Sequence, residues 1–423
     1  MPQRIVIVGS GFAGLWAALS ARRLISSNAE KATADIEVSV IAPDANLVVR
    51  PRLYETNPAA MSTSVEELYR VCGVRFVYGI VDTIRTADHE IEMVDRAGVR
   101  STVPYEKLIL AAGSRVVQPA IPGISDFAFS VDQLEDAVKL ERHLHNLASK
   151  PPSIARNTVV VCGGGFTGIE LATELPGRLR GILGEEANVR VIVVDRRQDI
   201  GPELGTAPRP HIAKALEDVK AETRLGPSVV SIDAEGVTLS SGERIEALTA
   251  VWTAGLAATP LTKQVSDKRD AVGRLYVDKD LRVPSAKDVF ATGDASLAEA
   301  DDKGHYAKMS CQHAIPLGIF AGNNAAAELL GIATVPYSQP AYQCCLDLGG
   351  AGAIVYKGWE ATVGYRGDEA KNMKRFINST LIYPPKAIAS VAFTVADPAF
   401  DGSDFTVDHP SFLKYYQENG LSF

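Results

Sequence analysis

The chain has 423 residues, which at roughly 150 residues per domain predicts two or three domains and excludes a minimal binding module. Hydrophobic residues make up 46% of the chain and charged residues 22%, so the composition is that of a folded globular protein and excludes bulk disorder. The 43 basic and 51 acidic residues leave a net charge of −8, which provides no general basic surface for phosphate backbones and argues against nucleic-acid binding.

Cysteine spacing and hydropathy favour a cytoplasmic protein. Five cysteines form no CxxC pair and no evenly spaced framework, as is typical of a reducing compartment. The N-terminus runs directly into a strand-like segment without the features of a secretory signal. No apolar run approaches the roughly 20 residues that span a bilayer. We therefore expect a cytoplasmic protein, and leave open a peripheral position at the inner face of the membrane.

The first predicted unit is a strand, a glycine-rich turn and a helix. An apolar strand over 4–8 leads into GSGFAG at 9–14, and a helix-like stretch and a second strand over 37–41 follow. In such a GxGxxG turn the first glycine permits a tight turn, the second lets the main chain approach a pyrophosphate, and the third lets helix and strand pack closely. The residues expected to hold a dinucleotide here are Gly9, Gly11, Phe12, Ala13 and Gly14.

The end of the second strand departs from the usual dinucleotide-binding pattern. An acidic residue normally ends this strand and holds the adenosine ribose. Here the strand ends in Ala42 and Pro43, and Asp44 follows. The sequence leaves open whether Asp44 or the backbone alone holds the ribose.

The same pattern is repeated in the middle of the chain. After a predicted helix over 131–147 and a Pro-Pro linker at 151–152, a strand leads into GGGFTG at 163–168, and a further strand follows over 189–194. One GxGxxG is a weak signal, but two copies, each between a strand and a helix, predict two dinucleotide sites. The residues expected to form the second site are Gly163, Gly165, Phe166, Thr167 and Gly168.

Asp195 ends the second strand of this repeat. A carboxylate there accepts a hydrogen bond from the ribose 2′-hydroxyl of NADH and repels the 2′-phosphate of NADPH. Arg196 and Arg197 follow directly, and in the alternative their guanidinium groups bind a 2′-phosphate. The sequence favours NADH and leaves NADPH open.

The order of the remaining motifs resembles a known superfamily. LILAAGS at 108–114, IPG at 121–123 and VFATGD at 289–294 stand around the second glycine turn in the order typical of flavoproteins that bind two dinucleotides. Over residues 4 to about 330 the chain is similar to the pyridine nucleotide-disulfide oxidoreductase superfamily. The segments that most resemble type II NADH dehydrogenases, the single-subunit NADH:quinone oxidoreductases, are RLYE at 52–55, GIELA at 168–172, VWTAG at 251–255 and IYPP at 382–385.

This resemblance implies an α/β fold with two Rossmann-type domains and a smaller C-terminal portion. The implied segments are residues 1–125 and 271–335 for the FAD-binding domain, 126–270 for the NAD(P)H-binding domain, and 336–423 for acceptor contact, an interface or membrane docking. The implied activity passes hydride from NADH through FAD to a quinone or similar acceptor. Because the flavin does this chemistry, the protein needs no nucleophile of its own. We recognise no metal-ligand pattern in the sequence.

The resemblance also implies cofactor contacts. It places the Asp294 carboxylate against a ribityl hydroxyl of the flavin, a role that suits an acceptor beside a helix N-terminus. The alternative is an Asp that only caps the following helix. The other cofactor-binding residues implied by the motifs are Ala112, Gly113, Ala254, Gly255 and Gly293.

Glu170 follows the last glycine of the second turn and is the first catalytic candidate. Related dehydrogenases place the matching Glu near the nicotinamide and flavin rings, where it orients the hydride donor. The alternative is a carboxylate in the first helical turn that stabilises the helix dipole by roughly 0.3–1 kcal/mol.

Gln312 is the second candidate and concerns the electron acceptor. Type II NADH dehydrogenases carry an Ala-Gln-x-Ala-x-Gln helix near the flavin, and this chain retains Gln312 and Ala314 of that motif. Cys311 replaces the first Ala and Pro316 the second Gln. Because proline removes a donor and disturbs a helix, the inference of quinone binding is weakened.

Several alternatives stay open. Cys344 resembles the late flavin-proximal cysteine of sulfide:quinone oxidoreductases, with Cys162 as an imagined partner, but a third family cysteine is missing between 73 and 161. A reductase of a small iron–sulfur protein shares the same core but needs a basic docking patch. A flavoprotein that acts through partners, like apoptosis-inducing factor, would turn over slowly with every quinone.

The C-terminal portion bears on membrane contact. Relatives carry amphipathic anchor helices there, and this chain has Lys371, Lys374 and Arg375 beside an apolar pair, followed by a polar tail over 408–423. The sequence leaves open both peripheral membrane docking and assembly into a homodimer.

Overall fold

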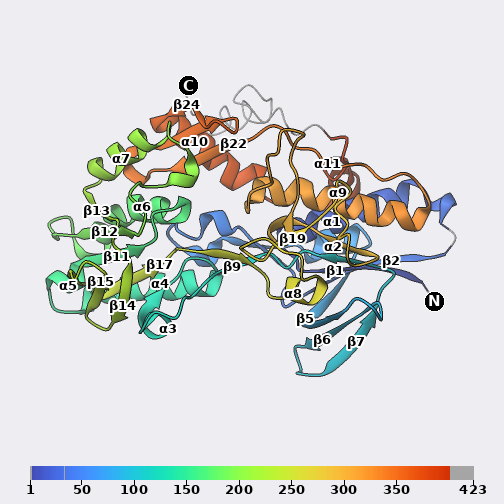
Figure 1. Ribbon diagram of the computed structural model, residues 1–423, viewed down its shortest axis with the longest axis horizontal. Coiled ribbons are helices and arrows are strands. Elements are labelled where there is room, and N and C mark those ends of the chain that lie inside the picture. Colours follow the sequence, from blue (N-terminus) through green and yellow to red (C-terminus); the bar gives the residue numbers. More distant parts are fainter. Residues whose placement is uncertain (1, 33, 401–423) are drawn as a thin grey trace.

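The computed structural model describes residues 2–32 and 34–400, and its N-terminal part is built on a seven-stranded sheet (Figure 1). In spatial order the strands are β20 (Val289–Ala291), β8 (Lys107–Leu110), β1 (Gln3–Val8), β2 (Ile36–Ala42), β5 (Arg75–Arg85), β6 (Glu90–Asp95) and β7 (Arg100–Pro104). The first five pair in parallel, and β6 and β7 extend the sheet as an antiparallel hairpin. Since β20 returns from late in the chain to pair with β8, the sheet brings distant segments to one edge.

Two long helices pack together against this sheet, α1 (Phe12–Ser27) and α9 (Cys311–Leu330). Two glycines of α9 permit the contact, because side chains there would collide with α1. A Cβ on Gly318 would lie 2.3 Å from the main-chain oxygen of Ala13, and one on Gly322 2.0 Å from that of Ala17. This close packing brings the first turns of α9 beside the first glycine turn.

The second unit is a five-stranded parallel sheet. Its strands, in spatial order, are β10 (Ala128–Phe129), β17 (Thr249–Trp252), β11 (Thr158–Cys162), β12 (Arg190–Asp195) and β13 (Ala221–Leu225). Every residue of β11 is buried, as expected for a parallel strand that is covered on both faces. The principal helices of this unit are α4 (Leu134–Asn146), α6 (Phe166–Leu183) and α7 (Arg209–Asp218). A three-stranded antiparallel sheet packs beside it, formed by β14 (Val229–Asp233), β15 (Gly236–Leu239) and β16 (Arg244–Glu246).

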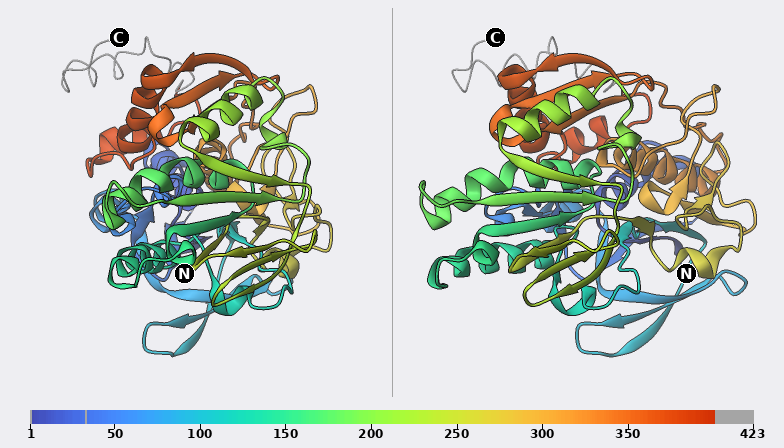
Figure 2. Two further views of the ribbon diagram at one scale, coloured as in Figure 1. Left: turned by 90° about the vertical axis from the view of Figure 1, so that its left-hand side faces the viewer. Right: turned by 60° about the vertical axis from the view of Figure 1, so that its left-hand side comes forward.

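The C-terminal part is an antiparallel sheet followed by helices. It consists of β22 (Gln343–Asp347), β23 (Ala353–Lys357), β24 (Thr362–Arg366), α10 (Gly367–Phe376) and α11 (Ala389–Val395). The sheet packs beside α6 of the second unit, while α11 packs on α1 of the first (Figure 2). The C-terminal part therefore contacts both dinucleotide-binding units.

The remaining elements are short. They are α2 (Glu66–Val71), α3 (Ile124–Phe127), α5 (Ile154–Asn157), α8 (Thr262–Val265), β3 (Asn46–Val48), β4 (Ser62–Ser64), β9 (Ser114–Val116), β18 (Leu256–Ala258), β19 (Leu275–Tyr276) and β21 (Ser296–Leu297). Strands β9 and β18 pair antiparallel where the chain passes between the two units. Within residues 2–32 and 34–400, no helix has the length and apolar character needed to cross a bilayer.

The architecture confirms the predicted α/β fold with two Rossmann-type units and a smaller C-terminal portion. The helix predicted over 131–147 is α4. The segment boundaries at 125, 270 and 335 stay predictions. The polar tail over 408–423 lies outside the described residues.

Candidate functional site

A continuous cavity of about 2890 Å³ runs between the two Rossmann-type units and the C-terminal part. Both glycine turns open onto it, as do the first turns of α9 and the edge of the C-terminal sheet. The predicted site residues that line it are Gly9, Gly11, Phe12, Ala13, Asp44, Ala112, Gly113, Gly163, Gly165, Phe166, Thr167, Glu170, Asp195, Arg196, Ala254, Gly255, Gly293, Asp294 and Gln312. Two predicted residues, Gly14 and Gly168, are not among its lining residues.

The first glycine turn is a steric cradle. Gly9 has φ +108°, and a Cβ there would lie 2.5 Å from the main-chain oxygen of Ala111. A Cβ on Gly14 would lie 1.9 Å from the main-chain oxygen of Gly9, so this third glycine allows packing rather than ligand contact. Gly11, by contrast, has open space where its Cβ would be. The main chain and the N-terminus of α1 are thus accessible to an anionic diphosphate.

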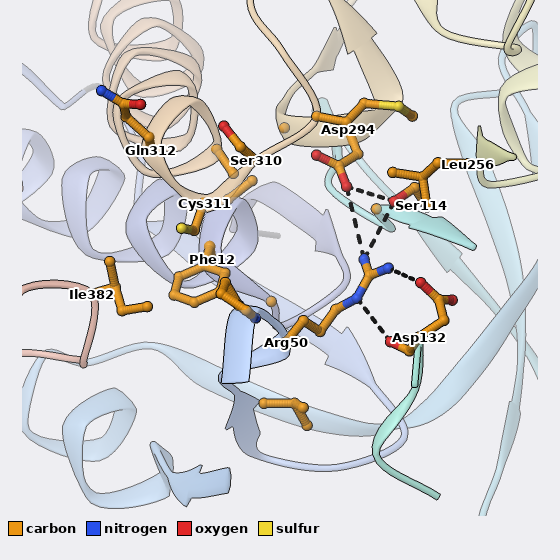
Figure 3. Close-up of a pocket in the computed structure, with 18 of the residues that line it drawn as sticks. Phe12, Arg50, Ser114, Asp132, Leu256, Asp294, Ser310, Cys311, Gln312 and Ile382 are labelled. Atoms are coloured by element: carbon orange, nitrogen blue, oxygen red, sulfur yellow. Dashed lines mark hydrogen bonds and ion pairs between the residues drawn. The ribbon is translucent and has the colours of Figure 1, made fainter. Parts of the chain in front are cut away.

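Asp294 also lines the cavity, next to Gly293, which packs against Ala13 of this turn, and it is held by polar side chains (Figure 3). Its Oδ2 accepts a hydrogen bond of 2.6 Å from Ser114 Oγ and lies 3.8 Å from the Arg50 guanidinium. Arg50 also donates to the main-chain oxygen of Asp132 at 3.1 Å and forms an ion pair with its carboxylate. Burial raises the pKa of Asp294 above its usual range.

Arg50 and Asp132 were not predicted from the sequence. Arg50 stands just before the RLYE segment, and Asp132 lies at the start of the region that leads to α4. No local pattern marks either residue, because the two meet only when segments 82 residues apart fold together. Only the residue type of Arg50 could have suggested its role, since a guanidinium group is a common partner of carboxylates and phosphates.

Asp44 lies at the edge of the cavity rather than inside it. Its side chain is 62% exposed and forms a 2.6 Å ion pair with Arg96. Ser10 Oγ donates to the main-chain oxygen of Asp44 at 3.0 Å, which ties this loop to the glycine turn. The backbone is therefore better fixed at this position than the carboxylate.

The second glycine turn repeats the cradle. Gly163 has φ +129°, and a Cβ on Gly168 would lie 1.8 Å from the main-chain oxygen of Gly163. Asp195 is buried, and its Oδ2 accepts a hydrogen bond of 2.7 Å from the Gly164 N–H. The carboxylate at the end of β12 is thereby fixed beside the turn.

The two arginines after Asp195 differ. Arg197 donates to both carboxylate oxygens of Asp195, at 2.9 and 2.7 Å, whereas Arg196 is exposed at the cavity wall. Burial opposes ionisation of Asp195, but hydrogen bonds from Arg197 and the Gly164 N–H lower its pKa below the usual range. Asp195 is thus an anion whose nearest cation is already paired with it.

Glu170 is not at the end of a helix, in contrast to the helix-dipole interpretation. Helix α6 begins at Phe166, so Glu170 is its fifth residue, and its side chain is almost fully buried. Its Oε1 lies 2.8 Å from Lys374 Nζ of α10 and accepts a hydrogen bond of 3.0 Å from the Asp347 N–H. Burial raises the pKa of Glu170 to about 7. Burial alone would lower the pKa of Lys374, but the Glu170 carboxylate raises it.

Lys374 therefore has a different position from the one its sequence context suggests. The sequence analysis considered the basic residues of this segment only in relation to membrane docking, which it left open. Lys374 is instead buried at the cavity wall and also donates to the main-chain oxygen of Cys345 at 2.9 Å. Lys371 forms a 2.5 Å ion pair with Asp347. Lys374 thus links α10 to α6, whereas Lys371 ties α10 to β22 within the C-terminal part.

Gln312 lies in the first turn of α9 and lines the cavity. Pro316 does not end the helix, which continues to Leu330, contrary to the expected disturbance. Because proline has no N–H, the main-chain oxygen of Gln312 lacks its usual helical donor. Gln339 Nε2 donates to that oxygen at 3.2 Å instead. A side chain from outside the helix thus compensates for the substitution.

The cysteines near the cavity are buried or half-buried thiols. Cys162, Cys311, Cys344 and Cys345 all line it and are free. Burial raises the pKa of Cys311 to about 11 and that of Cys162 to about 12, and it also raises the pKa of the other two thiols. All four are therefore protonated at neutral pH, which disfavours nucleophilic thiolate chemistry.

Comparison with known proteins defines the class. The family model for pyridine nucleotide-disulphide oxidoreductases matches residues 3–318. The chain belongs to this family, which confirms the resemblance seen in its motifs. NADH dehydrogenase-like protein Rv1812c of Mycobacterium tuberculosis is 42% identical over 390 residues, which cover 90% of this chain and 94% of that protein.

Two further proteins, one similar in sequence and one similar in structure, are a type II NADH dehydrogenase and a sulfide:quinone oxidoreductase. The type II NADH:quinone oxidoreductase NdhA of Mycobacterium tuberculosis is 30% identical over 324 residues, 69% of this chain and 66% of that protein. The sulfide:quinone oxidoreductase of Aquifex aeolicus has a similar structure, with a TM-score of 0.73 at 14% identity, covering 96% of this chain and 95% of that one. The latter likeness shows the fold alone.

Proposed function

We propose that this protein is an FAD-dependent enzyme that oxidises NADH and passes the electrons to a quinone. The observation that carries the proposal is that two dinucleotide-binding turns open onto one cavity, whose further wall is apolar. Membership of the pyridine nucleotide-disulphide oxidoreductase family and 30% identity to a type II NADH:quinone oxidoreductase support it.

The residues at the first turn fit FAD. Gly11 leaves the main chain open to a diphosphate, and the N-terminus of α1 stabilises the negative charge. Asp294 is a buried acceptor for a ribityl hydroxyl, and Arg50 balances its charge from 3.8 Å. Bound FAD supplies the hydride acceptor and the onward transfer of electrons.

The residues at the second turn fit NADH. The Asp195 carboxylate is fixed by the Gly164 N–H and positioned to accept from ribose hydroxyls, while it repels a 2′-phosphate. Arg197 is paired with Asp195, so its charge is already compensated. This arrangement favours NADH over NADPH. The exposed Arg196 is the one feature of this strand end that favours NADPH.

Glu170 and Lys374 form a buried ion pair at the cavity wall between the second turn and the C-terminal sheet. We assign Glu170 to orientation of the hydride donor. Its raised pKa, about 7, also lets it hold a proton near neutral pH. Lys374 keeps the carboxylate in place and limits the cost of its burial.

The acceptor side of the cavity suits a quinone. Gln312 supplies a polar side chain at the start of α9, and the wall beyond it is largely apolar. The apolar lining residues of this wall include Ile315, Ile319, Phe320, Ile382 and Val395. A quinone matches this combination of carbonyl oxygens on an apolar body.

The experiment is anaerobic stopped-flow mixing of the FAD-loaded protein with NADH or NADPH, followed by mixing of the reduced protein with quinones or ferricyanide. Fast bleaching of the flavin by NADH and fast reoxidation by a quinone are expected. Reoxidation only by ferricyanide would contradict the quinone assignment and favour a protein acceptor. Reduction by sulfide rather than NADH would contradict the proposal and favour a sulfide:quinone oxidoreductase.

We also propose peripheral membrane docking through the C-terminal part. Ile388, Val391 and Phe400 are exposed apolar side chains around α11, and two of them, Val391 and Phe400, also line the cavity. Replacement of Ile388 and Val391 by Ser is expected to reduce co-sedimentation with anionic lipid vesicles. Unchanged sedimentation would contradict docking through this surface. A cytoplasmic location and a homodimer stay predictions, and light scattering tests the latter.

A further inference from the structure

A second carboxylate covers the second glycine turn. Glu203 belongs to the 3₁₀ turn Pro202–Leu204, which follows β12 by a short loop, and it lines the cavity. A Cβ built on Gly165 would lie 2.8 Å from Glu203 Oε1. The carboxylate therefore fills the space directly over the glycine whose openness lets a dinucleotide diphosphate approach the main chain.

Arg197 fixes the orientation of this carboxylate. Its guanidinium donates to Glu203 Oε2 at 2.7 Å while it also pairs with Asp195. The three side chains carry a net charge of −1. Glu203 is 44% exposed, so solvent is available to it when it leaves the turn.

The loop backbone is held independently of the side chain. The Gly201 N–H donates to the main-chain oxygen of Gly164 at 2.9 Å, and Ile200 is buried against the same glycine. The loop and the turn are thus joined by the main chain. Glu203 can therefore leave its position by rotation of its side chain and release of its ion pair with Arg197, without movement of the main chain.

A carboxylate and a diphosphate compete for the same features. The positive end of a helix dipole stabilises either anion, and Glu203 lies at the N-terminus of α6, over its N-cap Gly165. A diphosphate at the same place would accept from the free main-chain N–H groups, whereas the carboxylate accepts from Arg197. Both are also anions, so they repel each other if held together. Occupancy of the turn by Glu203 and by a diphosphate is therefore mutually exclusive.

We propose that Glu203 is a built-in competitor for the diphosphate of NADH, which leaves the second glycine turn when the dinucleotide binds and returns when the product departs. This inference rests on the proposed use of the second turn for NADH. It assigns Glu203 to the control of dinucleotide affinity and release, separately from ribose recognition by Asp195.

The test compares two charge-neutralising substitutions on the same loop. Glu203→Gln removes the competing charge with little change of shape. Asp199→Asn is the matched control, because Asp199 is an exposed carboxylate that pairs with Arg209 at 2.7 Å and is not among the cavity-lining residues. Thermal unfolding of both FAD-loaded variants confirms that they are folded, and Glu203→Ala provides a second replacement.

The readout is calorimetric binding of ADP-ribose, which carries the diphosphate but no nicotinamide. We expect Glu203→Gln to bind ADP-ribose about fivefold more tightly than the wild type, and the gain to shrink in high salt. Asp199→Asn is expected to bind like the wild type. Equal affinity of the two variants, weaker binding by Glu203→Gln, or no binding by any variant would overturn the inference.

Failure of the proposed function is a separate outcome. Calorimetry with ADP-ribose does not depend on hydride transfer. If NADH fails to bleach the wild-type flavin, the proposed function is wrong. If NADH bleaches it and Glu203→Gln binds ADP-ribose no more tightly than Asp199→Asn, only the role of Glu203 is wrong.

Discussion

The glycine turn that begins at Gly9 and the one that begins at Gly163 have similar main-chain geometry. They differ in which atoms lie over the middle glycine. Space is open over Gly11, whereas the Glu203 carboxylate lies over Gly165. An open cradle suits a cofactor that stays bound through many turnovers. A cradle with an internal competitor suits a substrate that must leave after each one.

The acidic residues at the end of the second strand of each unit also differ, in their burial and in their partners. Asp44 is largely exposed and paired with Arg96, while Asp195 is buried against its own glycine turn. In the proposed function the first site therefore depends on backbone contacts and on Asp294 from a distant segment, and the second on a local carboxylate. The repeated motif determines the shape of a site, and the residues around it determine how tightly and for how long a ligand is held.

The largest effects are expected from the third glycine of each turn. Gly14→Ala and Gly168→Ala each place a Cβ within 2 Å of a main-chain oxygen, which the packed turn cannot relieve. We expect a loss of about 3 kcal/mol in the free energy of unfolding for each. Gly14→Ala is expected to release FAD, and Gly168→Ala to retain FAD but lose NADH binding. Flavin content and denaturant unfolding measure both.

Gly177→Ala is the control for these substitutions. Gly177 is an exposed residue inside α6 with open space at its Cβ position, so alanine there is expected to stabilise the protein by about 0.5–1 kcal/mol. If Gly14→Ala and Gly168→Ala lost the same ligand, the two turns would not serve two different dinucleotides.

Asp294→Ala is expected to have the next largest effect. It removes the carboxylate acceptor at the first site and leaves Arg50 with Asp132 and Ser114 as partners. The protein is expected to lose FAD during purification while it still binds ADP-ribose at the second turn. Retention of stoichiometric flavin, measured by absorbance after denaturation, would reduce Asp294 to a structural residue.

The sequence predicted those parts of the site that local patterns encode. Each glycine turn directly follows a strand, Asp195 is the last residue of β12, and Asp294 lies three residues after the end of β20. The strand period and the turn chemistry therefore predict these positions without knowledge of the fold. The two-unit fold followed from the repeat of this pattern. These residues are predictable because their positions depend on neighbours in the chain.

The remaining parts depend on packing between distant segments. Lys374 reaches Glu170 only because α10 packs beside α6, and Gln339 reaches the main chain of Gln312 across 27 residues. Glu203 lies on a loop without regular hydrophobic spacing. No periodicity marks such residues, so the sequence analysis named Lys374 only in a segment that was left open for membrane docking, and it gave Glu203 no role.

The third prediction compares the acidic residues after the strands. Asp195→Ala is expected to raise the KM for NADH about 10- to 100-fold, because hydrogen bonds to a charged group are lost. Asp44→Ala is expected to leave FAD content unchanged, since its carboxylate is exposed and paired elsewhere. Steady-state kinetics and flavin titration measure the two effects. Loss of FAD from Asp44→Ala would contradict this difference, because both sites would then hold their dinucleotide through a carboxylate.

The smallest kinetic effect is expected at Glu170, where the second unit meets the C-terminal part. Glu170→Gln is expected to slow flavin reduction by NADH more than reoxidation, because in its proposed role the side chain orients the hydride donor. Since burial raises the pKa of Glu170 to about 7, the wild-type reduction rate should change through a transition near pH 7 that the Gln variant lacks. Stopped-flow measurements between pH 5.5 and 8.5, roughly one and a half units either side, would resolve it.

The same titration makes a stability prediction with a definite sign. The folded-state pKa lies above the usual value of 4.5, so the fold retains a proton that the unfolded chain releases. The stability that this proton contributes is complete below pH 4.5 and is lost as the pH rises through 7, by about 3 kcal/mol at most. The free energy of unfolding of the wild type minus that of Glu170→Gln should therefore fall over this range. A constant difference would mean that Lys374 keeps Glu170 ionised throughout, and that the carboxylate anchors the C-terminal part without exchanging a proton.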